Sequence, residues 1–230
     1  MNVLAIDTSG QQACAAIVDN YITIGEILLN ARTGEKSWTH SEILMPGIDS
    51  MLKLTGLCMT DVDCLAYTSG PGSFTGLRIG ASTALGLARG LNKPIIAVPT
   101  LDALAYNGLI DNGVVVPMMD ARRGQVYFAV YNGKNRVTDY SVLSVDEAMD
   151  VLESITVRVA NIVFLGDGAD AYREEILARM PTAQFAKQNL NRLRASSVGT
   201  WAWENFDKVK KPSDAADILY VRAPQAVSDA

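Results

Sequence analysis

One pattern of strands and turns occurs twice in this sequence and constrains the fold more than any other feature. Near the start, LAIDTSGQQACAAIVDN reads as an apolar strand ending at Asp7, a short polar turn and a second strand ending near Asn20. The segment VVPMMDARRGQVYFAVYN repeats this arrangement around Asp120. The repetition favours two copies of one structural unit. Because only one such repeat is visible, two unrelated α/β lobes stay open as the alternative.

The N-terminal part of the chain predicts a sheet that begins with a hairpin. Asp19-Asn20 suits a two-residue turn, because Asp and Asn tolerate the positive φ angles that such turns require. With a helix before each of the last two strands, the order β-β-β-α-β-α-β and right-handed crossovers correspond to a ribonuclease-H-like layout. The apolar runs place the strands at residues 3–6, 13–18, 21–29, 64–68 and 95–98.

The first helix should begin near residue 40. Apolar residues recur with helical spacing from Leu44 to Thr55, and Thr39 and Glu42 stand three apart ahead of them, as in a capping box. Gly56 is placed to end this helix. Pro46 lies inside the window and predicts a kink or a later helix start, because proline has no backbone N–H.

The second helix, expected over residues 75–89 and closed by Gly90, carries a stripe of small residues. The stripe repeats every fourth position, at Gly76, Gly80, Ala84 and Ala88. Each glycine inside a helix costs about 1 kcal/mol relative to alanine, so the stripe should permit a close approach of another backbone. Two alternatives stay open here: the stripe packs on the chain's own sheet, or a helix of another chain docks there.

The second half of the chain follows the same plan less regularly. The expected elements are a strand at 162–165 followed by Gly166-Asp167-Gly168, and helices near 170–180 and 196–208. We therefore expect an α/β protein with an N-terminal lobe at 1–105 and a C-terminal lobe at 106–230. The C-terminal helix could pack back onto the first lobe.

Composition excludes several classes of function. Twenty Lys and Arg residues against twenty-five Asp and Glu give a net charge of −5, whereas a protein that binds nucleic acid unaided normally carries a basic excess. The three cysteines are odd in number and form no C-x-x-C motif, which is typical of a reduced cytosolic chain. No signal peptide or apolar run of about 20 residues is visible, so we expect a cytoplasmic protein without a membrane anchor.

His40 is the single histidine of the chain. A metal site built on paired histidines is therefore excluded, and any histidine-based triad would have to use this residue. It could serve as a general base for Ser41 or Ser73. Adjacent residues rarely align for such a transfer, and the chain has no G-x-S-x-G elbow, so a hydrogen-bonding role at the start of the helix is favoured.

Two turns could present backbone N–H groups to a phosphate. The carboxylate of an aspartate at the end of the first strand can hold a metal ion or a water molecule. A glycine-rich turn after a later strand can bring its backbone N–H groups close to the anion. GPGSFTG lacks the lysine of a P-loop, however, and a tight strand-to-helix turn that needs glycine is the competing interpretation. The residues of this vestigial nucleotide loop are Asp7, Ser9, Gly70, Gly72 and Ser73.

Three stretches together resemble the TsaB (YeaZ) family of bacterial tRNA threonylcarbamoyladenosine biosynthesis proteins. They are LAIDTS, the entry to an apolar helix at Thr39–Glu42 with Pro46 and Asp49, and SGPGSFTGLRIGASTALGLARGLNKPIIAVPTLDALA. The resemblance is strong over residues 1–130 and thinner afterwards, where Arg222 in LYVR matches a C-terminal feature. It implies an actin-like/Hsp70-like (ASKHA) fold of two ribonuclease-H-like lobes, the second degenerate.

The resemblance also implies a catalytic paralogue, TsaD, which carries an H-x-x-x-H metal pair after the strand that follows the glycine loop. Here AVPTLDALA places Thr100 and Leu104 at those positions. Imidazoles suit divalent iron or zinc, whereas a hydroxyl and a leucine do not replace them. Gly166-Asp167-Gly168 is likewise a weak version of the glycine pair that receives adenosine in ATP-binding relatives.

From this resemblance we expect a non-catalytic subunit that binds and activates TsaD, in an assembly with the ATPase TsaE. The complex would transfer threonylcarbamoyl to N6 of adenosine 37 in tRNAs that read codons beginning with A. ATP and a divalent metal would be bound by the partners, tRNA would be contacted only indirectly, and the chain alone would be a homodimer. The expected interface residues are Ser41, Leu44, Met45, Ile48, Met51, Leu52, Gly76, Leu77, Gly80, Thr83, Ala84 and Leu87.

Two alternatives belong to other functional classes. An independent ATP-dependent kinase of the ASKHA superfamily is favoured by Asp7 and GPGSFTG, and disfavoured by the missing lysine and the weak adenosine loop. A glycoprotease-type peptidase ranks last, because the chain has neither a metal pair nor a credible triad.

Overall fold

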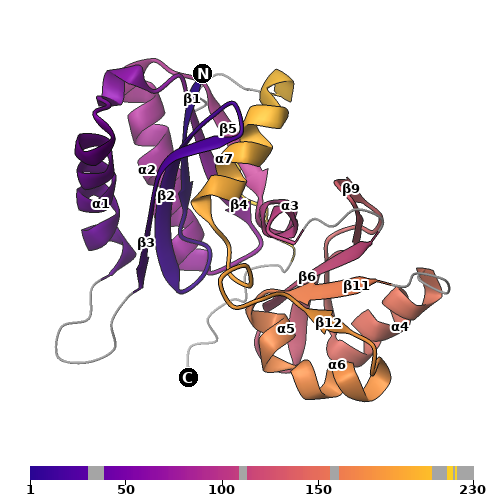
Figure 1. Ribbon diagram of the computed structural model, residues 1–230. Coiled ribbons are helices and arrows are strands. Elements are labelled where there is room, and N and C mark those ends of the chain that lie inside the picture. Colours follow the sequence, from indigo (N-terminus) through magenta and orange to yellow (C-terminus); the bar gives the residue numbers. More distant parts are fainter. Residues whose placement is uncertain (31–38, 109–112, 156–160, 209–216, 220, 222–230) are drawn as a thin grey trace, which may run out of the picture.

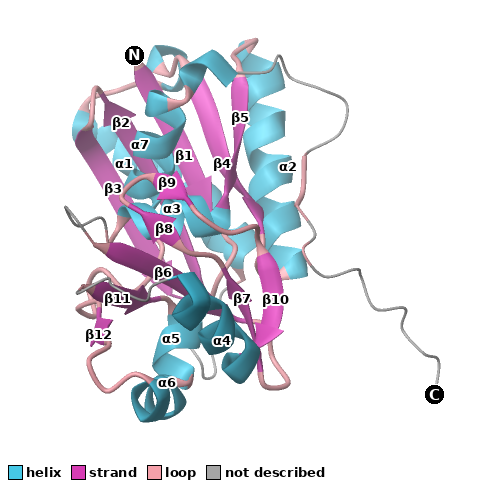
Figure 2. Ribbon diagram, turned by 90° about the vertical axis from the view of Figure 1, so that its right-hand side faces the viewer, coloured by secondary structure: helices cyan, strands magenta, loops and turns pink. Residues whose placement is uncertain are grey.

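The computed structural model describes residues 1–30, 39–108, 113–155, 161–208, 217–219 and 221. They form two lobes, each built on its own sheet (Figure 1). The first sheet has the strand order β3-β2-β1-β4-β5, with β1–β2 and β2–β3 antiparallel and β1–β4 and β4–β5 parallel (Figure 2). Its strands are β1 (Asn2–Asp7), β2 (Gln12–Asp19), β3 (Ile22–Asn30), β4 (Cys64–Gly70) and β5 (Ile95–Pro99).

The hairpin between β2 and β3 turns one residue later than the sequence indicated. Asn20 and Tyr21 take the positive φ angles, 46° and 68°, and Asp19 is still part of β2. Asp19 is retained in the strand because it pairs with Ile22 at the end of the ladder, and its carboxylate also binds the N-terminal amine at 2.7 Å. The expectation of an Asp19-Asn20 turn is therefore wrong by one position.

Helix α1 (His40–Thr55) starts where its capping box places it. The side chains and backbones of Thr39 and Glu42 cap each other, and Gly56 ends the helix in a left-handed conformation. Pro46 lies inside α1, so the later helix start is wrong. Burial of Leu44, Ile48, Met51 and Leu52 against the sheet outweighs the backbone hydrogen bond that proline forgoes.

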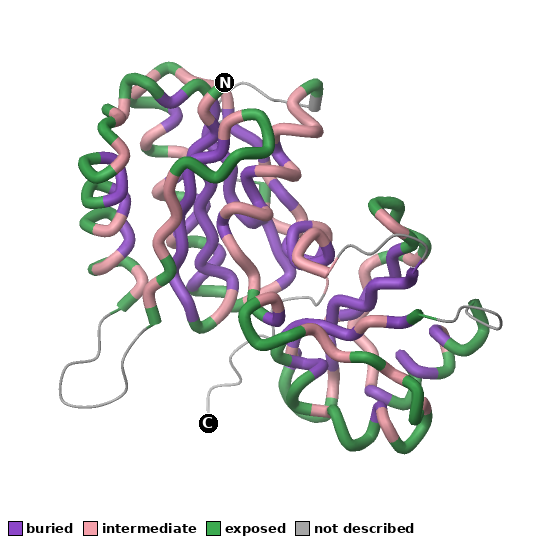
Figure 3. Tube along the Cα trace, viewed as in Figure 1, coloured by how far each residue is buried: buried purple, intermediate pink, exposed green. Residues whose placement is uncertain are grey.

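Helix α2 (Phe74–Leu91) is capped at its start by the Ser73 hydroxyl and ends at Asn92, not at Gly90. Asn92 adopts the left-handed conformation, with φ of 52°, that usually falls to glycine at such a position. Both α1 and α2 cover one face of the first sheet, and their outer sides are exposed (Figures 1 and 3).

The second sheet repeats the first strand by strand. Its order is β10-β7-β6-β11-β12, with the same alternation of antiparallel and parallel pairs. Its strands are β6 (Val114–Asp120), β7 (Gln125–Phe128), β10 (Ser141–Ser144), β11 (Ile162–Leu165) and β12 (Gln184–Phe185). This correspondence confirms the duplicated ribonuclease-H-like fold that the Asp7 and Asp120 segments predict.

The second lobe departs from the first in three ways. A hairpin of β8 (Tyr131–Asn132) and β9 (Asn135–Arg136) is inserted after β7. The expected helix at 170–180 is split into α5 (Asp167–Ala171) and α6 (Arg173–Arg179), and β12 spans two residues only. Helix α4 (Val145–Ile155) joins α5 and α6 on one face of this sheet, with Phe128 and Phe164 in the core between them.

Helices α3 and α7 connect the two lobes. Helix α3 (Thr100–Tyr106) follows β5 and lies between the sheets: Ala103 packs with Val3 and Cys64 of the first, and Leu101 and Leu104 pack on Val115 and Leu165 of the second. Helix α7 (Ala195–Glu204) follows β12 of the second sheet, but packs on β1 and β2 of the first, where Gly199 lies against Val18. A 3₁₀ turn at Phe206–Lys208 follows α7 in place of further helix.

The described C-terminal residues return to the first lobe. Leu219 donates its N–H to the Ser69 carbonyl at 2.7 Å, and the Tyr67 hydroxyl bonds both backbone groups of Asp217. Arg222, which carries part of the family resemblance, lies outside the described residues. Within the described residues, no helix has the length and apolar character needed to cross a membrane.

Candidate functional site

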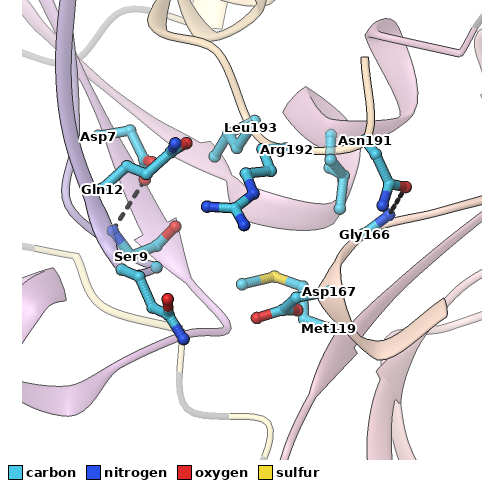
Figure 4. A pocket seen from close by; sticks show the side chains of 12 residues that line it. Asp7, Ser9, Gln12, Met119, Gly166, Asp167, Asn191, Arg192 and Leu193 are labelled. Atoms are coloured by element: carbon cyan, nitrogen blue, oxygen red, sulfur yellow. Dashed lines mark hydrogen bonds between the residues drawn. The ribbon is translucent and has the colours of Figure 1, made fainter. Parts of the chain in front are cut away.

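A cleft lies between the two lobes, at the carboxyl ends of β1 and β6 (Figure 4). Its cavity volume is about 90 Å³, and the wider hollow of about 550 Å³ around it is partly open to solvent. The first lobe, α3 and the segment before α7 form one wall, and the β6 and β11 ends form the other. The lining residues are Asp7, Ser9, Gly10, Gln11, Gln12, Leu104, Met119, Gly166, Asp167, Asn191, Arg192 and Leu193.

Asp7 ends β1 and is 2% exposed. One oxygen of its carboxyl group accepts the Ser9 N–H at 2.9 Å and the Thr68 hydroxyl at 2.6 Å. Burial raises the pKa of Asp7 above its usual value, and the hydrogen bonds from Ser9 and Thr68 only partly oppose this. No cation pairs with this carboxylate among the described residues, so it is an uncompensated acidic group at the cleft wall.

The second lobe contains the matching aspartate in the same local geometry. Asp120 ends β6, and its carboxylate accepts the N–H of Arg122, two residues later, at 2.8 Å. Its own N–H donates to Asp167 at 3.0 Å, which places the Asp167 side chain beside the strand end. Asp7 and Asp120 thus form equivalent turns, as the sequence echo predicts.

The glycine-rich turn after β4 packs against the turn after β1. Ser73 donates its N–H to the Ser9 carbonyl at 2.7 Å, while its hydroxyl accepts from Gly76 at 3.2 Å. A Cβ at Gly72 would lie 2.7 Å from the Ser9 carbonyl oxygen. The structure therefore brings the five residues of the predicted nucleotide loop together, and uses Gly72 and Ser73 for strand-to-helix packing.

Thr100 and Leu104 have structural partners in place of a metal. The Thr100 hydroxyl is fully buried and accepts the Gly70 N–H at 3.1 Å. The Leu104 side chain forms part of the apolar floor of the cleft and packs close to Gly166. The described residues contain no cluster of three His, Cys, Asp or Glu side chains able to hold a metal ion. The side chains at positions 100 and 104 are not a donor set that suits a divalent transition metal.

His40 forms a hydrogen bond between its Nε2 atom and the Gln11 carbonyl oxygen at 3.2 Å. This contact ties the start of α1 to the turn that lines the cleft, which agrees with the expected role at the start of a helix. Cys14 is fully buried, and burial raises the pKa of its thiol well above the usual value. A protonated, enclosed thiol is a poor nucleophile.

The chain is similar to known proteins in sequence and in fold. Residues 34–225 match the family described as TsaD: tRNA N6-adenosine threonylcarbamoyltransferase. The Bacillus subtilis (strain 168) protein named tRNA threonylcarbamoyladenosine biosynthesis protein TsaB is 34% identical over 186 residues, which are 80% of this chain and 79% of that protein. This chain belongs to the TsaB family.

Another TsaB relative, from Escherichia coli (strain K12), is 40% identical over 133 residues, covering 57% of this chain and 55% of that protein. The solved structure of YeaZ from Pseudomonas aeruginosa aligns with a TM-score of 0.72 and 25% identity, over 95% of this chain and 99% of that one. A ROK hexokinase from Thermus thermophilus aligns with a TM-score of 0.50 and 10% identity, over 89% and 100%, which shows a shared fold alone. These likenesses confirm the actin-like fold.

The TsaB resemblance predicted a partner interface that the structure corrects. Four of its residues, Ser41, Met45, Thr83 and Leu87, are exposed or half-buried on the outer sides of α1 and α2. The others fill the core of the first lobe, because the small-residue stripe packs on the chain's own sheet: a Cβ at Gly76 would overlap the Thr8 carbonyl oxygen. The buried residues are Leu44, Ile48, Met51, Leu52, Gly76, Leu77, Gly80 and Ala84.

Sequence reasoning missed four residues that line the cleft. Gln12, Met119, Asn191 and Arg192 line it, but no motif marks them. Asn191 and Arg192 lie in an irregular segment between β12 and α7, and only the return of α7 to the first lobe brings this segment to the cleft. The Asp120 echo predicted the position of the neighbouring Met119, although not its contact with the cleft.

Proposed function

We propose that this chain is a non-catalytic subunit of the system that makes threonylcarbamoyladenosine in tRNA, and that it binds and activates a TsaD-type transferase in the cytoplasm. TsaE and tRNA would join through the complex. The names of the TsaB relatives support the pathway. The state of Thr100 and Leu104 supports the non-catalytic role, and it is the observation on which the proposal rests.

Both residues contribute to folding at the place where the paralogue carries its metal ligands. The Thr100 hydroxyl is occupied by the Gly70 N–H, and Leu104 places carbon atoms at the cleft surface. A divalent ion needs lone pairs from nitrogen, sulfur or oxygen; leucine has none, and the Thr100 hydroxyl is fully buried and already accepts the Gly70 N–H. ATP and the metal are therefore assigned to the partner, where they would support the transfer.

The outer sides of α1 and α2 are the proposed surface for the partner. Ser41 and Met45 lie one turn apart on α1, and Thr83 and Leu87 lie one turn apart on α2. Met45 is 40% exposed, although it is a large apolar side chain. The methionine is an adaptable contact, which suits a surface that pairs with a second copy alone and with TsaD in the complex.

Reconstitution tests the activating role. Purified TsaD-type and TsaE-type proteins, ATP, a threonylcarbamoyl donor and unmodified tRNA are combined with and without this chain, and modified adenosine is quantified by mass spectrometry. We expect product only with the chain present, and no product from the chain without the TsaD-type protein. Product formed equally well without the chain, or by the chain without that partner, contradicts the proposal.

A substitution at Met45 tests the surface. We expect Met45→Glu to abolish both the homodimer, measured by light scattering after gel filtration, and copurification with the TsaD-type partner. Ile155→Glu is the matched control, because Ile155 is 41% exposed on α4 of the other lobe. Gly80→Leu is unsuitable, since a Cβ at Gly80 would lie 2.5 Å from the Thr8 hydroxyl oxygen and would disturb the core. Unchanged association of a folded Met45→Glu variant would refute this surface.

The kinase-like alternative is disfavoured by the packing of the second glycine turn. A Cβ at Gly166 would overlap the Met118 carbonyl oxygen, and one at Gly168 would lie 2.8 Å from the Met119 backbone. These glycines therefore serve the close packing of α5 on β6, which accounts for them without a nucleotide. Calorimetry with ATP distinguishes the two: we expect no micromolar binding, and saturable binding with turnover would support the kinase.

A further inference from the structure

We propose that the cleft between the lobes binds a small zwitterion of the α-amino-acid class, with Arg192 facing its carboxylate and Asp167 facing its ammonium group. This binding is separate from the partner surface on α1 and α2. Figure 4 shows the Arg192 guanidinium pointing into the space between the Asp7–Ser9 wall and Asp167. Four observations on the described residues support it.

The segment that carries Arg192 is fixed from both sides. The Asn107 side chain donates to the Leu190 carbonyl at 3.1 Å and to the Arg192 carbonyl at 2.6 Å. The Asn191 side chain, which is 4% exposed, accepts the Gly166 N–H at 2.8 Å and donates to Asp170 at 2.5 Å. Arg192 is thus presented by a backbone that is held in place before any ligand arrives, which lowers the entropic cost of binding.

Charges of both signs face the cleft without pairing with each other. Asp7 and Asp167 line it together with Arg192, and none of the three forms an ion pair in the described part of the chain. Arginine elsewhere in this protein does find carboxylates, as Arg179 does with Asp150 at 2.7 Å. An arginine and two aspartates that share one cleft and remain unpaired leave room for a ligand that carries both opposite charges.

The Ser9 hydroxyl supplies an independent indication of a ligand. Ser9 is 2% exposed and lines the cleft; its Oγ atom lies close enough to the Asp7 carboxyl group to lower the pKa of that group, but it makes no hydrogen bond of normal geometry among the described residues. Buried polar groups in folded proteins are nearly always paired, so an unpaired hydroxyl at a cleft wall is a free donor and acceptor for a bound molecule. A carboxylate oxygen beside Arg192 would accept this hydroxyl.

The shape of the cleft favours a small ligand over a nucleotide. The cavity volume of about 90 Å³ is well below the roughly 300–1,000 Å³ of pockets that hold drug-sized ligands. Leu104 and Met119 provide an apolar floor next to the charged groups. The two charged groups of an amino acid would face the charged side chains of the cleft, and its short side chain would lie on this apolar floor.

Calorimetric titration of the full chain tests the proposal, with glycine, L-alanine and L-threonine as probes. Propionate and ethylamine are the matched controls, because each keeps one charge of alanine and lacks the other. We expect saturable binding of at least one amino acid with a dissociation constant in about the micromolar-to-millimolar range, and at least about tenfold weaker binding of both controls. Inorganic phosphate and ATP are titrated in parallel and should bind more weakly than the amino acid.

Variants then assign the charges. Arg192→Gln and Asp167→Asn should each weaken the amino acid at least about tenfold, while Arg179→Gln, on the far side of the second lobe, should leave it unchanged. Ser9→Ala should weaken it less. The proposal is overturned if no amino acid binds up to about 50 mM, if phosphate or propionate binds as tightly as alanine, or if folded Arg192→Gln binds as wild type does.

Discussion

The amide N–H of Gly70 donates a 3.1 Å hydrogen bond to the buried hydroxyl of Thr100. This bond joins the end of β4 to the first residue of α3, and so connects the glycine turn with the helix that covers the second sheet. Gly70 has a φ angle of 122°, and the Leu219 carbonyl oxygen occupies the space where a Cβ would lie. Residue 70 therefore has no room for a side chain, and its buried N–H depends on the Thr100 hydroxyl for a hydrogen-bond acceptor.

Thr100→Val should destabilise the protein by about 1–3 kcal/mol, because it leaves the Gly70 N–H buried without an acceptor. Urea unfolding measures this change. Thr83→Val, at a half-buried position on α2, is the control and should change stability by less than about 0.5 kcal/mol. Equal effects of the two substitutions would show that the Gly70 contact contributes nothing specific.

Two glycines of the same helix should respond in opposite directions to alanine. Gly76→Ala should cost about 3 kcal/mol or more, because the new methyl group overlaps the Thr8 carbonyl oxygen, which is backbone and cannot move aside. Gly86→Ala should stabilise the protein by about 0.5–1 kcal/mol, since Gly86 is exposed, inside α2, and has open space at its Cβ position. Thermal unfolding of the two variants compares them; a stable Gly76→Ala protein would contradict the close packing of α2.

Asp7 should make the protein less stable as the pH rises above about 4. The folded-state pKa of Asp7 is raised by burial, so the folded state holds a proton that the unfolded state has already lost. Between the two pKa values the unfolded state binds fewer protons, and the free energy of unfolding therefore falls with increasing pH. Asp7→Asn should be more stable than wild type at pH 7, and the difference should vanish below pH about 4. Urea midpoints from pH 4 to 8 measure it, and a constant difference would exclude this origin.

Glu26 should show the opposite pH dependence. Burial alone would raise the pKa of Glu26, but hydrogen bonds from Arg194 and Ser196, at 3.0 and 2.9 Å, outweigh burial and lower it. The contribution of Glu26 to the free energy of unfolding is therefore complete above its unfolded-state pKa of about 4.5. This contribution is lost as the pH falls through the lower folded-state pKa. Glu26→Gln should cost about 1–3 kcal/mol at pH 7. Glu174→Gln, an exposed carboxylate on α6, should cost almost nothing, and a similar loss in both would refute the prediction.

The order of strands and helices was predictable because each element has a local signal. The Asp7 and Asp120 echo, the Thr39–Glu42 capping box and Gly56 all act within a few residues, and the structure contains each as expected. The errors are also local: Pro46 is tolerated inside α1, and Asn92 replaces Gly90 at the end of α2. In both cases tertiary packing overrides a propensity of a few kcal/mol at most.

Some residues of the site could be predicted from the sequence, and others could not. Asp7, Ser9 and the glycine turn follow strands with strong patterns, so their meeting at one sheet edge was predictable. Arg192 and its anchor Asn107 lie far apart in sequence and meet only in three dimensions. The stripe at Gly76 and Gly80 was visible, but a repeat of small residues cannot reveal whether the neighbouring backbone belongs to the same chain.

The return of α7 to the first lobe makes that lobe dependent on residues that are translated late in synthesis. The apolar face formed by Val3, Ala5 and Cys64 is covered by Val198 and Ala202 of α7. A nascent chain that has released only residues 1–105 from the ribosome therefore exposes this face until α7 emerges. The N-terminal sheet is translated first but is completed last, so a truncated product ending before α7 is a substrate for chaperones and proteases rather than a folded half.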